Sequence, residues 1–216
     1  MHDVGSNGGE YRITLYNLNL TSAQTALYFS LAASEPKITL IGDNIIDTSR
    51  SYENNSNTSQ RGISSSSTVG SYLTGDGEST LTIYTSPYAK KAPVKGNWII
   101  QDAKVSVIID ETKGTAINST YDMVEVVTGS SIPQGITLRG SGTFSINGRK
   151  VVLKPSENGY IDVNIKDAVE GTKFSFTSHP DPGYAWKRTK VGGTIYNSTS
   201  VSVLMPGANG EEGLVI

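Results

Sequence analysis

The segment Ile38–Thr48, ITLIGDNIIDT, contains two short stretches in which apolar and polar residues alternate, joined by a Gly-Asp turn. Alternation with a period of two is typical of a β-strand that buries one face. Similar segments begin near residues 13, 71, 98 and 136, at intervals of 25 to 38 residues. A third short apolar stretch follows most of these two-strand segments along the chain. The first 147 residues are therefore predicted to be a series of three-stranded units.

Strand repeats of this length are typical of a solenoid, in which each turn of the chain adds one strand to each face and equivalent side chains stack. The intervals are uneven because polar insertions interrupt them, and we expect surface loops at residues 49–60 and 110–131. The serine run at 64–67 also favours a loop, with a stack of small side chains inside the coil as the alternative. We expect a right-handed parallel β-helix of about five coils over residues 1–147.

The pattern changes at Asn147-Gly148, a dipeptide that favours a tight hairpin turn. Four short stretches with strand character follow, at residues 160–165, 171–176, 183–187 and 201–206. Short alternating strands separated by turns indicate an antiparallel sheet. We therefore expect an all-β chain with two domains, the parallel β-helix at 1–147 and a small antiparallel β-sandwich at 148–216. Within the second, Tyr184 and Trp186 alternate with small residues, which predicts burial on one sheet face.

The charge and composition disfavour two classes of binding partner, nucleic acid and anionic membrane. The formal net charge is -2 and the isoelectric point is about 5.7, so the chain has no excess of positive charge to attract nucleic acid or an anionic membrane. It has no cysteine, and no apolar run approaches the ~18 residues of a membrane span. No signal peptide is visible either. Because the first coil begins almost at once, we expect a segment of a longer bacterial protein that is secreted or anchored at the cell surface.

The rung pattern of an ITL-type strand, a glycine turn and a second strand resembles the bacterial carbohydrate-binding right-handed parallel β-helix family, over about residues 11–147. These are surface proteins with a pectate-lyase-like fold. The resemblance implies noncatalytic binding of polysaccharide, with Ca²⁺ as a candidate cofactor. Residues 150–216 are similar to divergent internalin-type B-repeats. The segments that carry this similarity are EGTKFSF at 170–176, PGYAWK at 182–187 and VSVLMP at 201–206. That resemblance implies a spacer or adhesion module without catalytic residues.

Aromatic side chains can stack on the apolar C–H face of a sugar ring. The predicted coils offer five candidates for carbohydrate binding, which are Tyr84, Tyr88, Tyr16, Tyr28 and Trp98. Tyr84 and Tyr88 fall in a turn insertion and are the stronger candidates. Trp98 takes the place of apolar Ile13 and Ile38 in the aligned units, which favours a core position for it over a binding role.

The same alignment places Asp43, Asp76 and Asp102 within one residue of a common turn. Neighbouring strands lie about 4.8 Å apart, so these carboxylates would form a ladder that could bind Ca²⁺, a cation that prefers oxygen ligands. A purely structural role is favoured, because aspartate is a common turn residue and calcium needs 6–8 oxygen ligands.

The sequence gives little support for an enzyme. The two histidines, His2 and His179, do not stand in an arrangement typical of a Ser-His-Asp site. A glycosidase needs two carboxylates at a suitable separation, and nothing in the sequence requires such a pair. The expected function is noncatalytic binding of polysaccharide or host glycan at the bacterial surface. The alternatives are a structural or adhesive spacer that holds a protein ligand, and a polysaccharide lyase or glycosidase.

Overall fold

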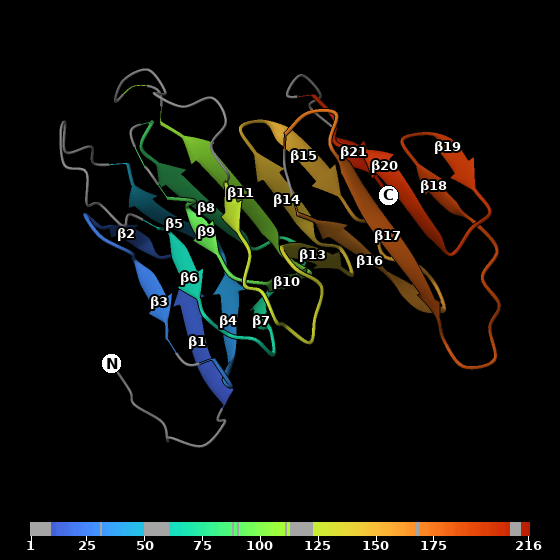
Figure 1. Ribbon diagram of the computed structural model, residues 1–216, viewed down its shortest axis with the longest axis horizontal. Helices are drawn as coiled ribbons and strands as arrows, with labels where there is room; N and C mark the ends of the chain where they lie inside the picture. The colour runs from blue at the N-terminus through green and yellow to red at the C-terminus, as the bar shows by residue number, and fades with distance from the viewer. Residues whose placement is uncertain are drawn as a thin grey trace.

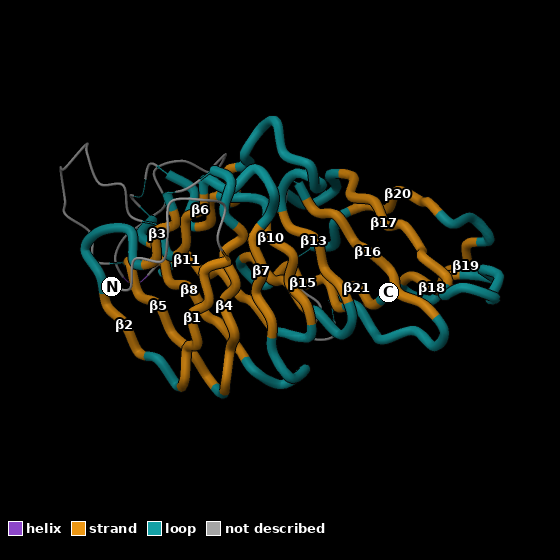
Figure 2. The backbone as a smooth tube through the Cα atoms, turned by 90° about the horizontal axis from the view of Figure 1, so that it is seen from below, coloured by secondary structure: helices purple, strands orange, loops and turns teal. Residues whose placement is uncertain are grey.

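The computed structural model describes residues 10–30, 32–49, 61–87, 89, 91–110, 112, 123–166, 169–207 and 213–216. Within these residues the protein is all-β and contains no α-helix, which confirms the predicted class. No helix in this part of the chain is long and apolar enough to cross a membrane. The strands lie side by side along the longest axis of the molecule, from β1, β2 and β3 at one end to β18 and β19 at the other (Figures 1 and 2).

Three sheets take one strand each from successive passes of the chain. The 8-stranded sheet starts with the parallel strands β1 (Glu10–Tyr16), β4 (Glu35–Ile41), β7 (Ser71–Thr74), β10 (Trp98–Gln101) and β13 (Ile136–Arg139). The 7-stranded sheet starts with β2 (Asn19–Thr21), β5 (Asp43–Thr48), β8 (Thr80–Thr85), β11 (Lys104–Ile109) and β14 (Thr143–Ile146), also parallel. The 4-stranded sheet consists of the parallel strands β3 (Leu27–Phe29), β6 (Ile63–Ser65), β9 (Val94–Lys95) and β12 (Val124–Glu125). We call each run of three consecutive strands, such as β4 to β6, a repeat.

The strand register differs from the sequence alignment at one step. Ile38 pairs with Leu73, and Trp98 pairs with Ser71, so Trp98 does not stand in the row of Ile38. The alignment of these repeats is wrong by two residues. Because side chains alternate between faces with a period of two, a shift of two leaves every side chain on the same face of the sheet.

Apolar side chains from all three sheets pack into one continuous core. One inward row of the 8-stranded sheet consists of Ile38, Leu73, Ile100 and Leu138, all 0–1% exposed. Full burial of such a side chain contributes roughly 1.5–3 kcal/mol. Trp98 is also fully buried, and its indole N–H donates to the carbonyl oxygen of Lys95 at 2.9 Å. The core position favoured for Trp98 is thus confirmed.

The serine run at 64–67 lies inside the stack of repeats. Ser64, Ser65 and Ser67 are buried. The Ser71 hydroxyl donates to Ser65 Oγ at 2.8 Å, and the Ser67 hydroxyl donates to the carbonyl oxygen of Ser34 at 2.5 Å. The favoured interpretation of this run as a surface loop is wrong, because these small side chains satisfy their hydrogen bonds with neighbouring repeats instead of with water.

Antiparallel pairing begins after β14. Asn147 and Gly148 have φ angles of 44° and 79°, the left-handed values that a two-residue hairpin turn requires, and they connect β14 to β15 (Arg149–Val152). This confirms the predicted hairpin. The 7-stranded sheet ends with β15 and β21 (Leu214–Val215), the one parallel pair among the described strands beyond β14. The 8-stranded sheet continues through β16 (Gly159–Ile165), β17 (Lys173–Pro180) and β20 (Ser200–Leu204), and β18 (Thr189–Val191) pairs with β19 (Thr194–Tyr196).

Both large sheets therefore run across residues 147–148, and the core is continuous across this point. The predicted boundary coincides with a change of strand direction inside shared sheets, and the division into two domains stays a prediction. The stretch at 183–187, predicted to be a strand, belongs to the unpaired segment between β17 and β18.

Candidate functional site

The aromatic residues predicted to bind sugar lie on three different sheets. Tyr16 is on β1 of the 8-stranded sheet, Tyr28 on β3 of the 4-stranded sheet and Tyr84 on β8 of the 7-stranded sheet. Tyr16 and Tyr28 are exposed, at 70% and 64%, whereas Tyr84 is half-buried. The three side chains therefore come from three different sheets, and their role in sugar binding stays a prediction.

The two remaining candidates give different outcomes. Tyr88 lies outside the described residues. Trp98 has no exposed surface and cannot stack on a sugar, so the prediction that it binds carbohydrate is wrong.

The predicted carboxylate ladder is not formed by Asp43, Asp76 and Asp102. The Asp76 carboxylate accepts a hydrogen bond within its own turn, from the Ser79 N–H at 2.8 Å. Asp43 and Asp102 accept hydrogen bonds from a neighbouring repeat, from Thr80 Oγ1 at 2.9 Å and from the Ser141 N–H at 2.8 Å. Backbone and side-chain hydrogen bonds from Ser79 hold the pKa of Asp76 below its ordinary value. In the described part of the chain, no three acidic or histidine side chains lie close enough together to bind a metal ion.

The turn after the first strand of each repeat shows what these residues do. Asn17 and Asp102 both adopt left-handed backbone conformations, with φ of 45° and 51°. Their side chains occupy the space beside Gly42 and Gly140 of the next repeat, where an added Cβ would lie 2.0 Å from Asn17 Oδ1 and 2.2 Å from Asp102 Oδ1. A side chain and a glycine thus interlock between neighbouring repeats, which is a structural role.

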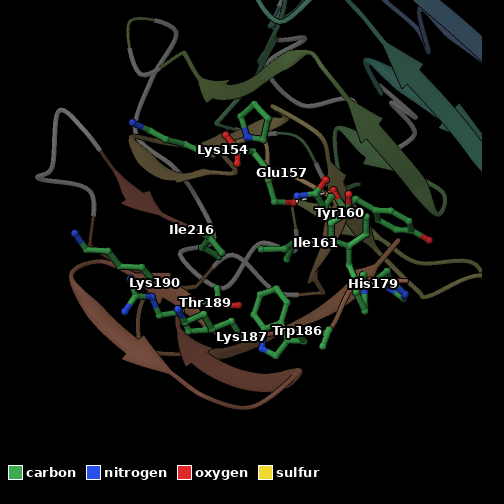
Figure 3. Close-up of a pocket in the computed structure, with 18 residues that line it drawn as sticks. Lys154, Glu157, Tyr160, Ile161, His179, Trp186, Lys187, Thr189, Lys190 and Ile216 are labelled. Carbon is green, nitrogen blue, oxygen red and sulfur yellow. Dashed lines mark hydrogen bonds between the residues drawn. The ribbon is translucent and has the colours of Figure 1, made fainter. Parts of the chain in front are cut away.

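A pocket of about 360 Å³ lies in the antiparallel region (Figure 3). One wall is the segment that follows β15, at residues 154–158, and the opposite wall is residues 184–188, in the segment between β17 and β18. Ile161 and Ile216, each 7% exposed, contribute apolar surface. The aromatic residues of the lining are Tyr160, His179, Tyr184 and Trp186. This volume lies within the ~300–1,000 Å³ range of small-molecule sites.

Tyr184 and Trp186, expected in the core of a sheet, instead belong to a loop. Tyr184 is 56% exposed, and its N–H donates to the carbonyl oxygen of Asp181 at 3.0 Å across a turn that contains Gly183 at φ 90°. Trp186 packs partly against the core, and its buried indole N–H has no hydrogen-bond partner among the described residues. The signal that could have predicted this loop is the turn-forming Pro182-Gly183, which outweighs the alternation that follows it.

Tyr160 is enclosed by groups from the two strands that flank β16. Its ring stacks on the ring of His179 from β17, with centroids 4.6 Å apart and an interplanar angle of 18°. The guanidinium carbon of Arg139 from β13 lies 4.8 Å from the centroid of the same ring. The two groups come from the strands on either side of β16. Tyr160 still keeps 40% of its surface exposed, so it contributes aromatic surface to the pocket together with Tyr184 and Trp186.

Asp162 fixes this stack in place. Its carboxylate accepts two hydrogen bonds from Arg139, from Nε at 2.8 Å and Nη2 at 2.9 Å, and lies 3.4 Å from His179 Nε2. The hydrogen bonds to Asp162 raise the pKa of Arg139 despite its partial burial. The guanidinium is thus held in a fixed two-point contact, the strong geometry for an arginine–carboxylate pair.

The pocket lining contains a single carboxylate side chain, that of Glu157. The common glycosidase mechanisms use two carboxyl groups, separated by roughly 5–9.5 Å. The lining residues therefore provide aromatic and polar binding surface without this pair.

No protein-family model matches the chain, and comparisons with curated proteins and with solved structures found no match either. The resemblances to carbohydrate-binding β-helices and to internalin-type repeats stay predictions.

Proposed function

We propose that the protein is a noncatalytic module that binds polysaccharide or host glycan outside the bacterial cell, within a secreted or surface-anchored protein. For its architecture we propose a right-handed parallel β-helix followed by a small antiparallel β-sandwich. Three ladders of parallel strands around one core support the first part of that architecture. The antiparallel pairings of β15, β16, β17 and β20 support the second.

The pocket between residues 154–158 and 184–188 carries the functional proposal. A pyranose has apolar C–H faces and a rim of hydroxyl groups, so it is bound best where aromatic rings lie beside hydrogen-bonding groups. Tyr184 offers an exposed ring, Trp186 a partly buried one, and Ile161 adds apolar surface. Both ring-bearing residues belong to one loop, so a ligand can contact both at once.

The test is retention of the protein on a panel of soluble and insoluble polysaccharides, with an assay for released reducing or unsaturated ends in the same samples. We expect retention without product. Tyr184→Ala should weaken binding about tenfold, the scale of one lost aromatic contact. The matched control is Leu204→Ala, which removes a 58% exposed apolar side chain of β20 outside the pocket lining and should leave binding unchanged.

Three results would overturn parts of this proposal. Retention that fails on every glycan would favour the spacer or protein-adhesin alternative. Release of sugar products would favour the lyase or glycosidase alternative. Binding that is lost in Tyr28→Ala or Tyr16→Ala, and kept in Tyr184→Ala, would place the site on the repeats and not in the pocket.

A further inference from the structure

The charge of the pocket is opposite in sign to that of the whole chain. Four of the lining residues are cationic, and Glu157 is the one acidic side chain among them, which leaves an excess of three positive charges. The cationic residues are Lys154, Lys187, Arg188 and Lys190. The complete chain has a formal net charge of -2. Positive charge is therefore concentrated around this cavity, although the net charge of the chain is negative.

These four charges are not neutralised within the part of the protein that the structure describes. All four residues are exposed, and none of the ion pairs between described residues involves them. Lys104, in contrast, is paired with Glu78 at 2.5 Å, and Lys95 with Glu125 at 3.0 Å. The pocket thus keeps several hydrogen-bond donors of positive charge for a ligand.

The aromatic and cationic groups are separated across the cavity. Figure 3 shows Lys154 and Lys190 toward one side of the view and Tyr160 and His179 toward the other, with Trp186 between them. Lys154 comes from the wall after β15, and Lys190 comes from β18 on the opposite wall. A ligand in this pocket would therefore meet aromatic rings along its body and ammonium groups from two walls at one end.

We propose that the pocket selects sugars that carry an anionic group, with the apolar face of the ring against Tyr184 and Trp186 and the anion at the end formed by Lys154 and Lys190. This inference rests on the glycan-binding function proposed above and names its ligand class. The chemistry is that of a charge-assisted hydrogen bond between an ammonium group and an anionic oxygen, which is about twice as strong as a neutral one. A carboxylate on a uronic acid and a sulfate ester both provide such an anion.

The experiment compares three oligosaccharides of equal length by titration calorimetry: a uronic acid oligomer, its carboxyl-reduced neutral counterpart and a sulfated oligomer. We expect at least one anionic oligomer to bind about tenfold or more tightly than the neutral one. Binding of the anionic oligomer should weaken as salt is raised, because ions screen exposed charges over about 8–10 Å. The uronic acid and sulfated arms identify which anion is preferred.

The double variant Lys154→Gln with Lys190→Gln should lose about tenfold in affinity for the anionic oligomer and keep its affinity for the neutral one. Lys173→Gln is the matched control, because Lys173 is an exposed lysine at the other end of β17 and outside the lining. Since all three lysines are exposed, the variants should retain the wild-type unfolding midpoint.

Equal affinity of the wild-type protein for anionic and neutral oligomers would overturn the anionic preference and leave the glycan-binding function in place. An anionic preference that survives in the double variant would overturn the assignment to Lys154 and Lys190. Absence of binding to all three oligomers and to the whole polysaccharide panel would instead remove the proposed function itself.

Discussion

The parallel repeats and the antiparallel region share two sheets and one core, yet they use their side chains differently. In the repeats, equivalent residues lie above one another, and polar groups such as Asn44 and the serines at 64–67 are occupied inside the stack. In the antiparallel region, the segment at 181–188 is free of strand pairing and presents Tyr184 to solvent. A regular stack thus provides support, while the residues available to a ligand come from a loop that pairing does not constrain.

The two tryptophans of the chain test this contrast most strongly. Trp98→Ala should lower the free energy of unfolding by about 3–5 kcal/mol, because it removes a fully buried ring that packs edge-on against Phe29 at 6.2 Å. Trp186→Ala, in the pocket loop, should cost only about 1–2 kcal/mol, since this ring is partly exposed. Urea denaturation followed by circular dichroism measures both. Equal losses would mean that Trp186 is a core residue and that the two regions do not differ in this respect.

Asn44 tests whether hydrogen bonds inside the stack hold neighbouring repeats together. Its fully buried amide accepts from the Leu18 N–H at 2.9 Å in one neighbouring repeat and donates to the carbonyl oxygen of Thr80 at 3.1 Å in the other. Asn44→Ala should cost about 2–3 kcal/mol in unfolding free energy, because buried backbone groups lose their partners.

Asn164→Ala, in the antiparallel region, is the matched change. Its amide is half-buried and donates to the carbonyl oxygen of Gln134 at 2.9 Å, so the expected cost is about 1 kcal/mol. A larger loss for Asn164 than for Asn44 in the same denaturation experiment would contradict the stronger internal bonding of the repeats.

An ion pair confined to the repeats gives a pH-dependent effect. Buried Arg61 and half-buried Lys95 both contact the carboxylate of Glu125. Burial alone would raise the pKa of Glu125, but the hydrogen bonds from Arg61 and Lys95 outweigh it and hold this pKa below the ordinary value of 4.5. Because the pKa is lower in the folded state, the stabilisation is present above pH 4.5 and is lost as the pH falls through the folded value.

Glu125→Gln should therefore reduce the free energy of unfolding at pH 7 by about 1–2 kcal/mol, a modest value because the Glu125 side chain is 42% exposed and its charge is screened. The difference from wild type should shrink as the pH is lowered below about 4. Urea denaturation at a series of pH values measures it. A difference that is constant from pH 7 to pH 3 would show that the charge of Glu125 does not stabilise the fold.

The smallest effect is expected at Asp102. Asparagine keeps an oxygen acceptor for the Ser141 N–H and tolerates the left-handed φ of 51°, so Asp102→Asn should change the unfolding free energy by no more than about 0.5 kcal/mol. Asp102→Ala should cost about 1–2 kcal/mol, since it loses both features. Thermal midpoints with added calcium and with chelator complete the test. A calcium-dependent rise in the midpoint that Asp102→Asn abolishes would restore the metal role in place of the turn role.

The repeats were predictable from the sequence because a strand period of two is a strong local signal, and Ile38–Thr48 carries it without interruption. The error of two residues between Ile38 and Ser71 did not affect the predicted core, since faces are preserved under such a shift. The serine run at 64–67 was mispredicted because polarity indicates exposure on average, whereas small hydroxyl groups can pair with one another inside a stack.

The candidate site was less predictable because its residues lie far apart in the sequence. The cavity joins residues near 154–160 to residues near 179–190. The two segments are brought together by the pairing of Gly159 with Pro180 and of Tyr160 with His179, and no local pattern encodes that juxtaposition. Alternation suggested burial of Tyr184 and Trp186, but the turn at Gly183 had already ended the strand. The sequence shows which residues are aromatic and could stack on a sugar, whereas the assignment of Tyr16, Tyr28 and Tyr84 to three separate sheets depends on the complete register.

The order of strands along the long axis also has a mechanical consequence. In the 8-stranded sheet β1 and β20 lie at opposite edges, and each inner strand is hydrogen-bonded to its two neighbours within the sheet. Tension that draws these two edges apart acts along the hydrogen bonds between strands, so the ladders open one after another and do not share the load. In single-molecule pulling, the protein should lengthen in a series of small steps at low force. It would yield as an extensible tether, in contrast to a domain whose terminal strands are loaded in shear and break together.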